Sequence, residues 1–157
     1  MSDFEALELQ GSERHKALAE IHKQISEWRL TMPAVTPLPL HFGLHRFKQT
    51  GETEFWIANE TRHGYCGKFL FVFDGQTCPY HHHRKKHETF FVMKGTLKLN
   101  IAGKESLLHE GQSLAIPPGT GHSFTGVGPA LLLEVSMPSI LHDNFFDDTQ
   151  IGDGGVI

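Results

Sequence analysis

The chain has 157 residues, of which 39% are hydrophobic and 20% are charged, and its formal net charge at pH 7 is −4. This length suits one domain with a real core, and the composition excludes a disordered chain. A negative net charge argues against a nucleic-acid surface, and no apolar run approaches the ~18 residues that a membrane span needs. We therefore expect neither nucleic acid nor a membrane as a partner.

The first residues and the two cysteines bear on where the protein works. Met1 to Glu5 are acidic and lack the apolar region of a signal peptide. Cys66 and Cys78 lie at the two ends of a predicted strand, which would hold them too far apart for a disulfide. These features favour a reducing, cytoplasmic location.

Residues 2–30 are predicted to be helical. Ser2 and Glu5 have the spacing of a capping box at the start of a helix. Further on, apolar residues fall three and four positions apart and share one helical face, which must pack against the body of the protein or a partner. This face comprises Leu18, Ile21, Ile25 and Trp28. Three prolines between positions 33 and 39 exclude further helix, so residues 1–39 are expected to form an N-terminal helical arm.

From residue 40 onward, short segments rich in β-branched, aromatic and leucine residues alternate with turns that contain glycine or proline. The predicted strands are 54–58, 68–73, 89–93, 96–101, 113–116 and 131–135, and Ala102-Gly103-Lys104 is predicted to be a hairpin turn. Strands at this spacing without intervening helices predict an all-β sandwich or barrel over residues 40–157. The tail from Pro138 is predicted to be mostly surface loop, held to the body by Phe145 and Phe146.

One stretch, "GQTCPYHHHRKKHETFFVMKG" from Gly75 to Gly95, holds four of the twelve histidines. A short internal run is not a purification tag, which leaves a metal site or a solvated loop. In an extended chain alternate residues share a face, so His81 and His83 point the same way while His82 points away. The basic run at 84–86 is interpreted as a solvated loop.

Two residues elsewhere can complete a metal site. Glu88 and His122 each share strand parity with the apolar residues that follow them. A barrel interior would then collect three imidazoles and one carboxylate. This mixed set suits Mn, Fe, Co, Ni or Zn and leaves one or two positions for water or substrate, and the lack of a thiolate weakens a structural zinc site.

These spacings resemble the two signature motifs of the cupin superfamily. The first block reads Gly75-x5-His81-x-His83-x4-Glu88-x6-Gly95, and the second reads Gly111-x5-Pro117-x-Gly119-x2-His122. The second motif departs only at its end, where Gly126 replaces an Asn that is not a metal ligand. The resemblance implies a small cupin β-barrel, a jelly-roll-like double-stranded β-helix, that binds a divalent metal. The implied ligands are His81, His83, Glu88 and His122.

A narrower resemblance covers roughly residues 54–148. The segments "YCGKFLFVFDGQTCPYHHH", "HETFF" and "LEVSMPSILHDNFFD" are similar to the small cupin-type D-lyxose isomerases. This resemblance implies an aldose–ketose isomerase that uses a divalent metal, often manganese, on a small sugar. It also places Lys68 and Glu134 as candidates for proton transfer. The chain departs from these isomerases in its shorter connections, with four residues between His83 and Glu88.

The chemistry of isomerisation fits such residues. It needs a polarised carbonyl and a base that reaches the carbon-bound hydrogen. Lys68 shares parity with apolar strand residues, and a nearby dication would lower its pKa and free the amine. Glu134 lies in an apolar strand and would need a partner if buried. The alternatives are a lysine at the barrel end and an exposed glutamate.

Two other functions fit the same ligands. An Fe(II)-dependent dioxygenase would consume O₂ and would not need Lys68 or Glu134. A non-catalytic sugar- or metal-binding module would bind its ligand without turnover. Cupin barrels commonly pair sheet to sheet, so we also expect a homodimer.

Overall fold

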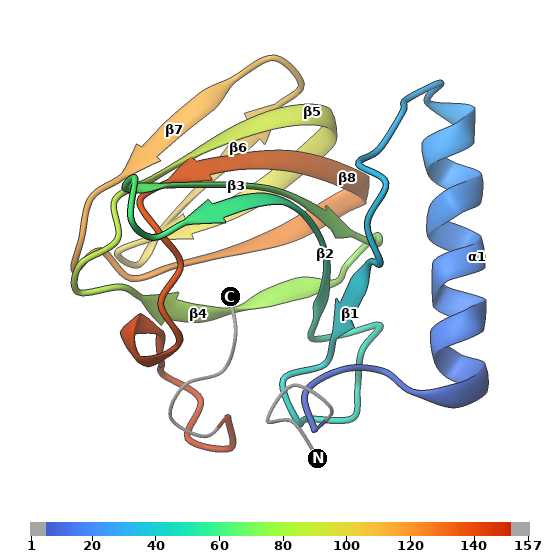
Figure 1. Cartoon of the computed structure of the whole chain (residues 1–157), viewed down its shortest axis with the longest axis horizontal. Helices are drawn as coiled ribbons and strands as arrows, with labels where there is room; N and C mark the ends of the chain where they lie inside the picture. The colour runs from blue at the N-terminus through green and yellow to red at the C-terminus, as the bar shows by residue number, and fades with distance from the viewer. Residues whose placement is uncertain (1–5, 152–157) are drawn as a thin grey trace.

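The computed structural model describes residues 6–151, which form one α-helix and a nine-stranded sheet (Figure 1). Along the chain the elements are α1 (Gly11–Glu27), β1 (Leu38–Leu40), β2 (Glu52–Glu60), β3 (Tyr65–Val72), β4 (Thr77–His82), β5 (Glu88–Ile101), β6 (Lys104–His109), β7 (Ser113–Ile116), β8 (His122–Ser136), the 3-10 helix η1 (Leu141–Asp143) and β9 (Phe145–Phe146). The sheet curves into a barrel, and the helix stands beside it. The predicted all-β barrel with an N-terminal helix is confirmed.

Two long strands join the layers of the barrel. β8 pairs with β3 through residues 130–136 and with β4 through residues 122–125. β5 runs along the other edge of β8, and its first half pairs with β7 while its second half pairs with β6. One layer therefore holds β1, β2, β3 and β7, and the other holds β4, β6 and β9.

A glycine lets β5 pass from one layer to the other. Gly95 has φ 82°, and a Cβ atom there would overlap the carbonyl oxygen of Pro129. Glycine alone adopts this conformation without a clash. The predicted strands 89–93 and 96–101 are thus one bent strand, because Gly95 bends the chain without ending the pairing with β8.

The other predicted strands agree with the structure to within a few residues. Segment 113–116 is β7, and segments 54–58 and 68–73 fall largely within β2 and β3. The hairpin predicted at Ala102-Gly103 joins β5 to β6. Segment 131–135 is the second half of β8, which starts earlier, at His122.

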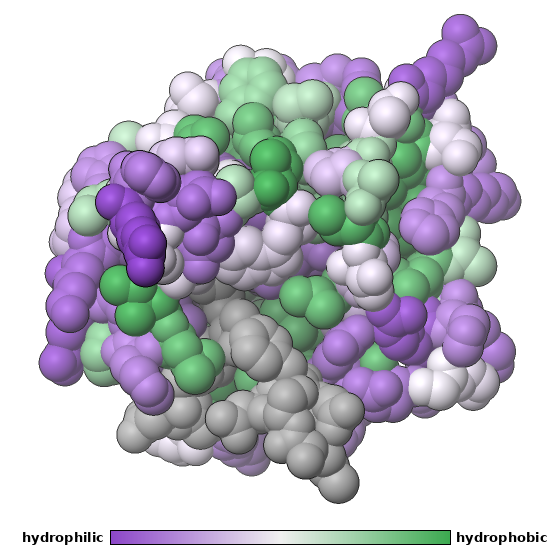
Figure 2. Space-filling view, viewed as in Figure 1, coloured by the Kyte–Doolittle hydropathy of each residue, from purple (hydrophilic) through white to green (hydrophobic). Residues whose placement is uncertain are grey.

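The apolar face of α1 packs on the outside of its own barrel. Ile21 and Ile25 are buried against Phe55 of β2, Phe71 of β3 and Leu131 of β8. Burying one such aliphatic side chain contributes roughly 1.5–3 kcal/mol, so this contact fixes the helix to the sheet. The surface over the helix, at the right of Figure 2, is mostly hydrophilic.

The helix is shorter than predicted, because it begins at Gly11. The residues just before it form an extended pair with β1, in which Leu9 N–H donates to the Pro39 carbonyl and His41 N–H donates to the Leu7 carbonyl, both at 2.8 Å. Those backbone bonds replace the ones that a helix would make. The capping box predicted at residues 2–5 lies outside the described residues.

The C-terminal tail is less of a surface loop than predicted. Asp143 is only 5% exposed, and β9 pairs with β4. The Phe146 ring lies against both Phe42 and His81. The prediction that Phe145 and Phe146 hold the tail to the body is confirmed.

Two further expectations concern the cysteines and the membrane. Cys66 and Cys78 are buried free thiols, as expected, but they lie on two strands, β3 and β4, and not at the two ends of one. Within residues 6–151, no helix is both long enough and apolar enough to cross a bilayer.

Candidate metal centre

Four side chains meet inside the barrel from three strands and one loop. His81 lies in β4, and His83 is the first residue after that strand. Glu88 is the first residue of β5, and His122 is the first residue of β8. Each is 1–2% exposed, and one possible ligand atom of each lies within 4.8 Å of the others. We call this group the His/Glu cluster. The pairing of His81 with His122 in neighbouring strands brings distant parts of the sequence together.

Backbone carbonyls fix the orientation of all three imidazoles. The Nδ1 atoms of His81, His83 and His122 lie 2.7, 2.9 and 2.9 Å from the carbonyl oxygens of Pro79, Asp143 and Thr120. Each Nδ1–H therefore donates to a carbonyl, which leaves the lone pair of each Nε2 directed into the cluster.

The inward-facing atoms fit a cation. The three Nε2 atoms and Glu88 Oε1 are buried and have no hydrogen-bond partner within residues 6–151. His122 Nε2 nevertheless lies 2.9 Å from Glu88 Oε1, and His83 Nε2 lies 3.5 Å from it. Buried lone pairs that face one another without a proton are costly, and a divalent metal would satisfy all four.

The pKa values favour the metal-binding forms. Burial lowers the pKa of His81 well below its usual value, and the neighbouring His122 and His83 lower it further. Burial and the Lys86 ammonium lower the pKa of His83 to about 4. Burial would raise the pKa of Glu88, but Lys86, His122 and His83 together outweigh it and hold that pKa well below the usual range. Neutral imidazoles and an ionised carboxylate are the forms that bind metal.

A chain of buried ion pairs continues from Glu88 across the interior. Glu88 Oε2 and Glu134 Oε1 both lie 3.0 Å from Lys86 Nζ. On the far side, Lys68 Nζ lies 3.7 Å from Glu134 Oε2 and 2.6 Å from Glu54 Oε1. Every member is buried. We call this set, Glu88, Lys86, Glu134, Lys68 and Glu54, the ion-pair chain.

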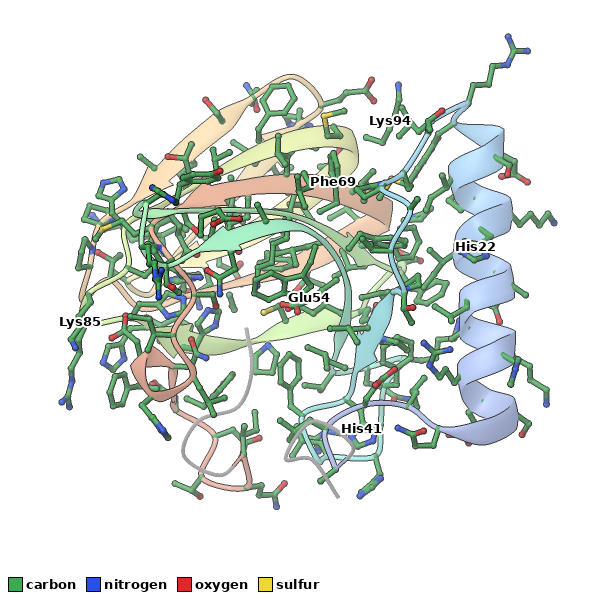
Figure 3. The ribbon with its side chains drawn as sticks, in the orientation of Figure 1. His22, His41, Glu54, Phe69, Lys85 and Lys94 are labelled. Atoms are coloured by element: carbon green, nitrogen blue, oxygen red, sulfur yellow. The ribbon has the colours of Figure 1, made fainter. Side chains whose placement is uncertain are left out.

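Neighbouring side chains hold the carboxylates and the Lys68 ammonium of the ion-pair chain in position. The Trp56 indole N–H donates to Glu54 Oε2 at 2.7 Å, and its ring lies 4.9 Å from Lys68 Nζ. The Ser136 hydroxyl donates to Glu134 Oε1 at 2.8 Å. Glu54 lies within the ring of strands in Figure 3. These contacts hold the charged groups in place. Removing one partner of a buried ion pair typically lowers the free energy of unfolding by about 3–5 kcal/mol.

Mutual attraction keeps Lys68 and Glu134 charged. Burial alone would lower the pKa of Lys68, but Glu134 and Glu54 outweigh it and raise that pKa. Burial would raise the pKa of Glu134, but Lys68 and Lys86 outweigh it and lower that pKa. Lys68 is therefore an ammonium in the metal-free protein. The neutral amine expected from the sequence requires a nearby dication and stays a prediction.

The structure thus brings every sequence-predicted site residue into one interior region. Lys68 and Glu134 are neither at the barrel end nor exposed. The sequence interpretation missed Glu54 and Lys86, and it was wrong to place Lys86 in a solvated loop. The two residues that precede Lys86 are exposed, and Lys85 projects away from the barrel in Figure 3. Glu54 is missed because its inward parity is revealed only by its pairing with Leu70.

Comparison with known proteins agrees with this geometry. Residues 69–136 match the family model of the cupin domain. Over 153 residues the chain is 31% identical to the D-lyxose ketol-isomerase of Cohnella laeviribosi, and the match covers 75% of this chain and 82% of that protein. This chain belongs to the cupin-type D-lyxose isomerase family.

A second relative of this cupin is longer. The cupin is 29% identical over 142 residues to the D-lyxose/D-mannose isomerase of Escherichia coli O157:H7. That match covers 67% of this chain and 63% of the relative, so the chain spans less than two thirds of that protein's length.

The fold of the cupin is shared with an L-ribose isomerase. The enzyme of Cellulomonas parahominis, solved with no ligand, superposes with a TM-score of 0.76 at 16% identity, over 96% of this chain and 97% of that chain. The same enzyme solved with L-ribose superposes with a TM-score of 0.69 at 17% identity, over 88% and 93% of the two chains. At this identity the likeness shows the fold alone.

Proposed function

We propose that this cupin is a metal-dependent aldose–ketose isomerase that acts on a small sugar. The observation that carries the proposal is the unequal hydrogen bonding of the two carboxylate oxygens of Glu134. Its Oε1 accepts from Lys86 and Ser136, whereas its Oε2 is buried and has no hydrogen-bond partner in the described part of the chain. The Lys68 ammonium lies near Oε2, at 3.7 Å, which is beyond hydrogen-bond distance, so one oxygen of the carboxylate is held by hydrogen bonds and the other can accept a proton.

Glu134 is the proposed base. Its Oε2 would take the hydrogen of C2 of the open-chain sugar as a proton and give a proton to C1, while the hydroxyl proton of O2 passes to O1; between the two transfers the carboxyl group exchanges its proton with solvent. The lowered pKa of Glu134 keeps the carboxylate ionised, which is the form that accepts a proton, and the same shift makes it a weaker base than an unpaired glutamate.

Lys68 is the proposed partner of this base. As an ammonium beside Glu134, it would donate a hydrogen bond to the substrate oxygen on which negative charge develops. Glu54 and the Trp56 ring hold its Nζ in position. We therefore assign the proton transfer itself to Glu134, and the hydrogen bond to the substrate oxygen to Lys68.

The His/Glu cluster would hold the divalent metal, for which manganese is our first candidate and Fe, Zn, Ni or Co are alternatives. When bound, such a metal polarises the carbonyl and orients adjacent sugar oxygens as a Lewis acid. The names of the relatives, which are sugar isomerases, support this class of reaction.

The test is hydrogen exchange at C2. Manganese-loaded protein is incubated in D₂O with a panel of pentoses, hexoses and their phosphates, and NMR reads deuterium at C2. Lys68→Met and Glu134→Gln should each keep the metal and lose about 10²–10⁴-fold in rate. Matched changes in the exposed pair Lys98→Met and Glu105→Gln should leave the rate unchanged.

Two outcomes would contradict the proposal. The first is fully loaded wild-type protein that exchanges no hydrogen on any sugar, which would favour a binding module. The second is oxygen uptake with an iron-loaded protein, which would favour a dioxygenase. Full activity of both interior variants would contradict the assigned roles.

A further inference from the structure

Asp143 of the C-terminal tail touches the connection between two members of the His/Glu cluster. It lies in η1, about 60 residues beyond that connection in the sequence. Its backbone carbonyl accepts from His83 Nδ1 at 2.9 Å. Its side chain is directed at the residues that follow His83, the connecting loop 84–87.

The carboxylate of Asp143 binds three consecutive backbone N–H groups of the connecting loop. Oδ1 accepts from Arg84 at 3.0 Å and from Lys85 at 3.2 Å. Oδ2 accepts from Lys85 at 3.1 Å and from Lys86 at 3.0 Å. Bonds from N–H groups to an ionised oxygen are about twice as strong as neutral ones, so the carboxylate holds this loop in one turn.

The conformation of this turn decides which way Lys86 faces. Arg84, Lys85 and His87 are exposed, whereas Lys86 is 2% exposed. An ammonium leaves water only at a high cost in free energy, so a loose loop would return Lys86 to solvent. With the turn fixed, Lys86 Nζ reaches both Glu88 and Glu134 at 3.0 Å.

Further contacts hold Asp143 itself in place. β9 pairs with β4 through Phe145 and Phe146. The Arg84 guanidinium lies 4.2 Å from the centre of the Phe145 ring, and His82 stacks on the same ring. The tail therefore contacts both the backbone and the side chains of the connecting loop.

We propose that Asp143 is a positioning residue that assembles the reactive site from the C-terminal tail. It fixes the connecting loop so that Lys86 bridges Glu88 and Glu134. Lys86 in turn holds Glu134 Oε1, which leaves Oε2, the proposed base atom, without a hydrogen bond among the described residues. This inference rests on the proposed isomerase function for its kinetic consequence, while the hold on the loop is independent of any reaction.

A double-mutant cycle tests the kinetic consequence. Asp143→Asn keeps the size of the side chain but turns an NH₂ group toward the backbone N–H groups of the loop. Because a misplacement of about 1 Å can cost 10²-fold, kcat for C2 exchange should fall about a hundredfold. In the Lys86→Met background, where the bridge is already absent, the same change should cost less than about threefold. Losses that multiply fully in the double variant would show that Asp143 does not act through Lys86.

The control comes from the same tail. Asp148 makes a surface ion pair with Arg46 at 3.5 Å, so Asp148→Asn should leave kcat within about threefold of the wild type. An equal loss in both Asn variants would point to a general disturbance of the tail and would overturn the inference.

A second measurement needs no activity. In metal-free protein, hydrogen exchange should show the amides of residues 84–86 protected in the wild type and at least about tenfold faster in Asp143→Asn. Amides of the β5–β6 hairpin serve as the internal reference. Unchanged protection at 84–86 would overturn the inference. If the wild type turns over no sugar while these amides respond as expected, the proposed function fails and the hold of Asp143 on the loop stands.

Discussion

Replacing Glu52 by glutamine is expected to stabilise the metal-free protein at neutral pH. Glu52 is 0% exposed, and neither of its carboxyl oxygens has a hydrogen-bond partner within the described chain. Burial, and then the neighbouring Glu54 carboxylate, raise its pKa from 4.5 to about 8. The folded protein therefore keeps the proton of Glu52 at pH 7, whereas the unfolded chain releases it.

The size and sign of the effect follow from these two pKa values. Between pH 4.5 and about 8, unfolding releases one proton from Glu52, so the free energy of unfolding falls by about 1.4 kcal/mol per pH unit. The contribution is fully present below pH 4.5 and is lost as the pH rises toward 8. At pH 7 the loss amounts to roughly 3 kcal/mol. Glutamine has nearly the same shape as the neutral acid but carries no proton to release.

Urea unfolding between pH 5 and pH 8, with a chelator present, measures this effect. The difference in free energy of unfolding between Glu52→Gln and the wild type should grow by about 1.4 kcal/mol per pH unit. Glu60→Gln, an exposed change on the same strand β2, should give a curve parallel to the wild type. A Glu52→Gln curve that is also parallel would show that Glu52 is ionised in the folded protein and would refute the reasoning.

Three further predictions concern the metal, the barrel bend and assembly. His122→Ala should lose the divalent metal, as measured by elemental analysis. His82 stacks on Phe145 outside the cluster, so His82→Ala should keep about one ion per chain. Full metal occupancy in both variants would show that the ligand set is wrong. Gly95→Ala should lower the thermal midpoint clearly more than Gly103→Ala, since both have φ 82° but only a methyl group at position 95 meets backbone atoms. Sedimentation at high concentration should find a homodimer, and a monomer there would remove that expectation.

The sequence predicts the His/Glu cluster well because its information is local. His81 and His83 are two residues apart in an extended segment, so parity alone places them together. Glu88 and His122 begin strands, and their spacing from glycine and proline positions matches known motifs. Parity does not show that these strands are neighbours, so grouping all four residues also needs the barrel that the motifs imply.

The remaining site residues depend on contacts that are distant in the sequence. Lys86 faces inward because of Asp143 and Glu134, which lie 57 and 48 residues away. In β2 the usual rule is inverted, since Glu52 and Glu54 are buried in the barrel interior while Phe55 faces outward and is covered by α1. A sequence reader assigns Phe55 to the core and Glu54 to water, because the helix that covers the outer face is not visible in the strand itself.

The ion-pair chain also sets the sign of the charge inside the barrel. It contains the carboxylates of Glu54, Glu88 and Glu134 and only two ammonium groups, so one negative charge is left uncompensated. A divalent cation in the His/Glu cluster would reverse this excess to one positive charge. In a low-dielectric interior such a reversal acts strongly on any charged ligand. The metal-free protein should repel anions that the metal-loaded protein retains, so an anionic competitor distinguishes the two forms by affinity alone.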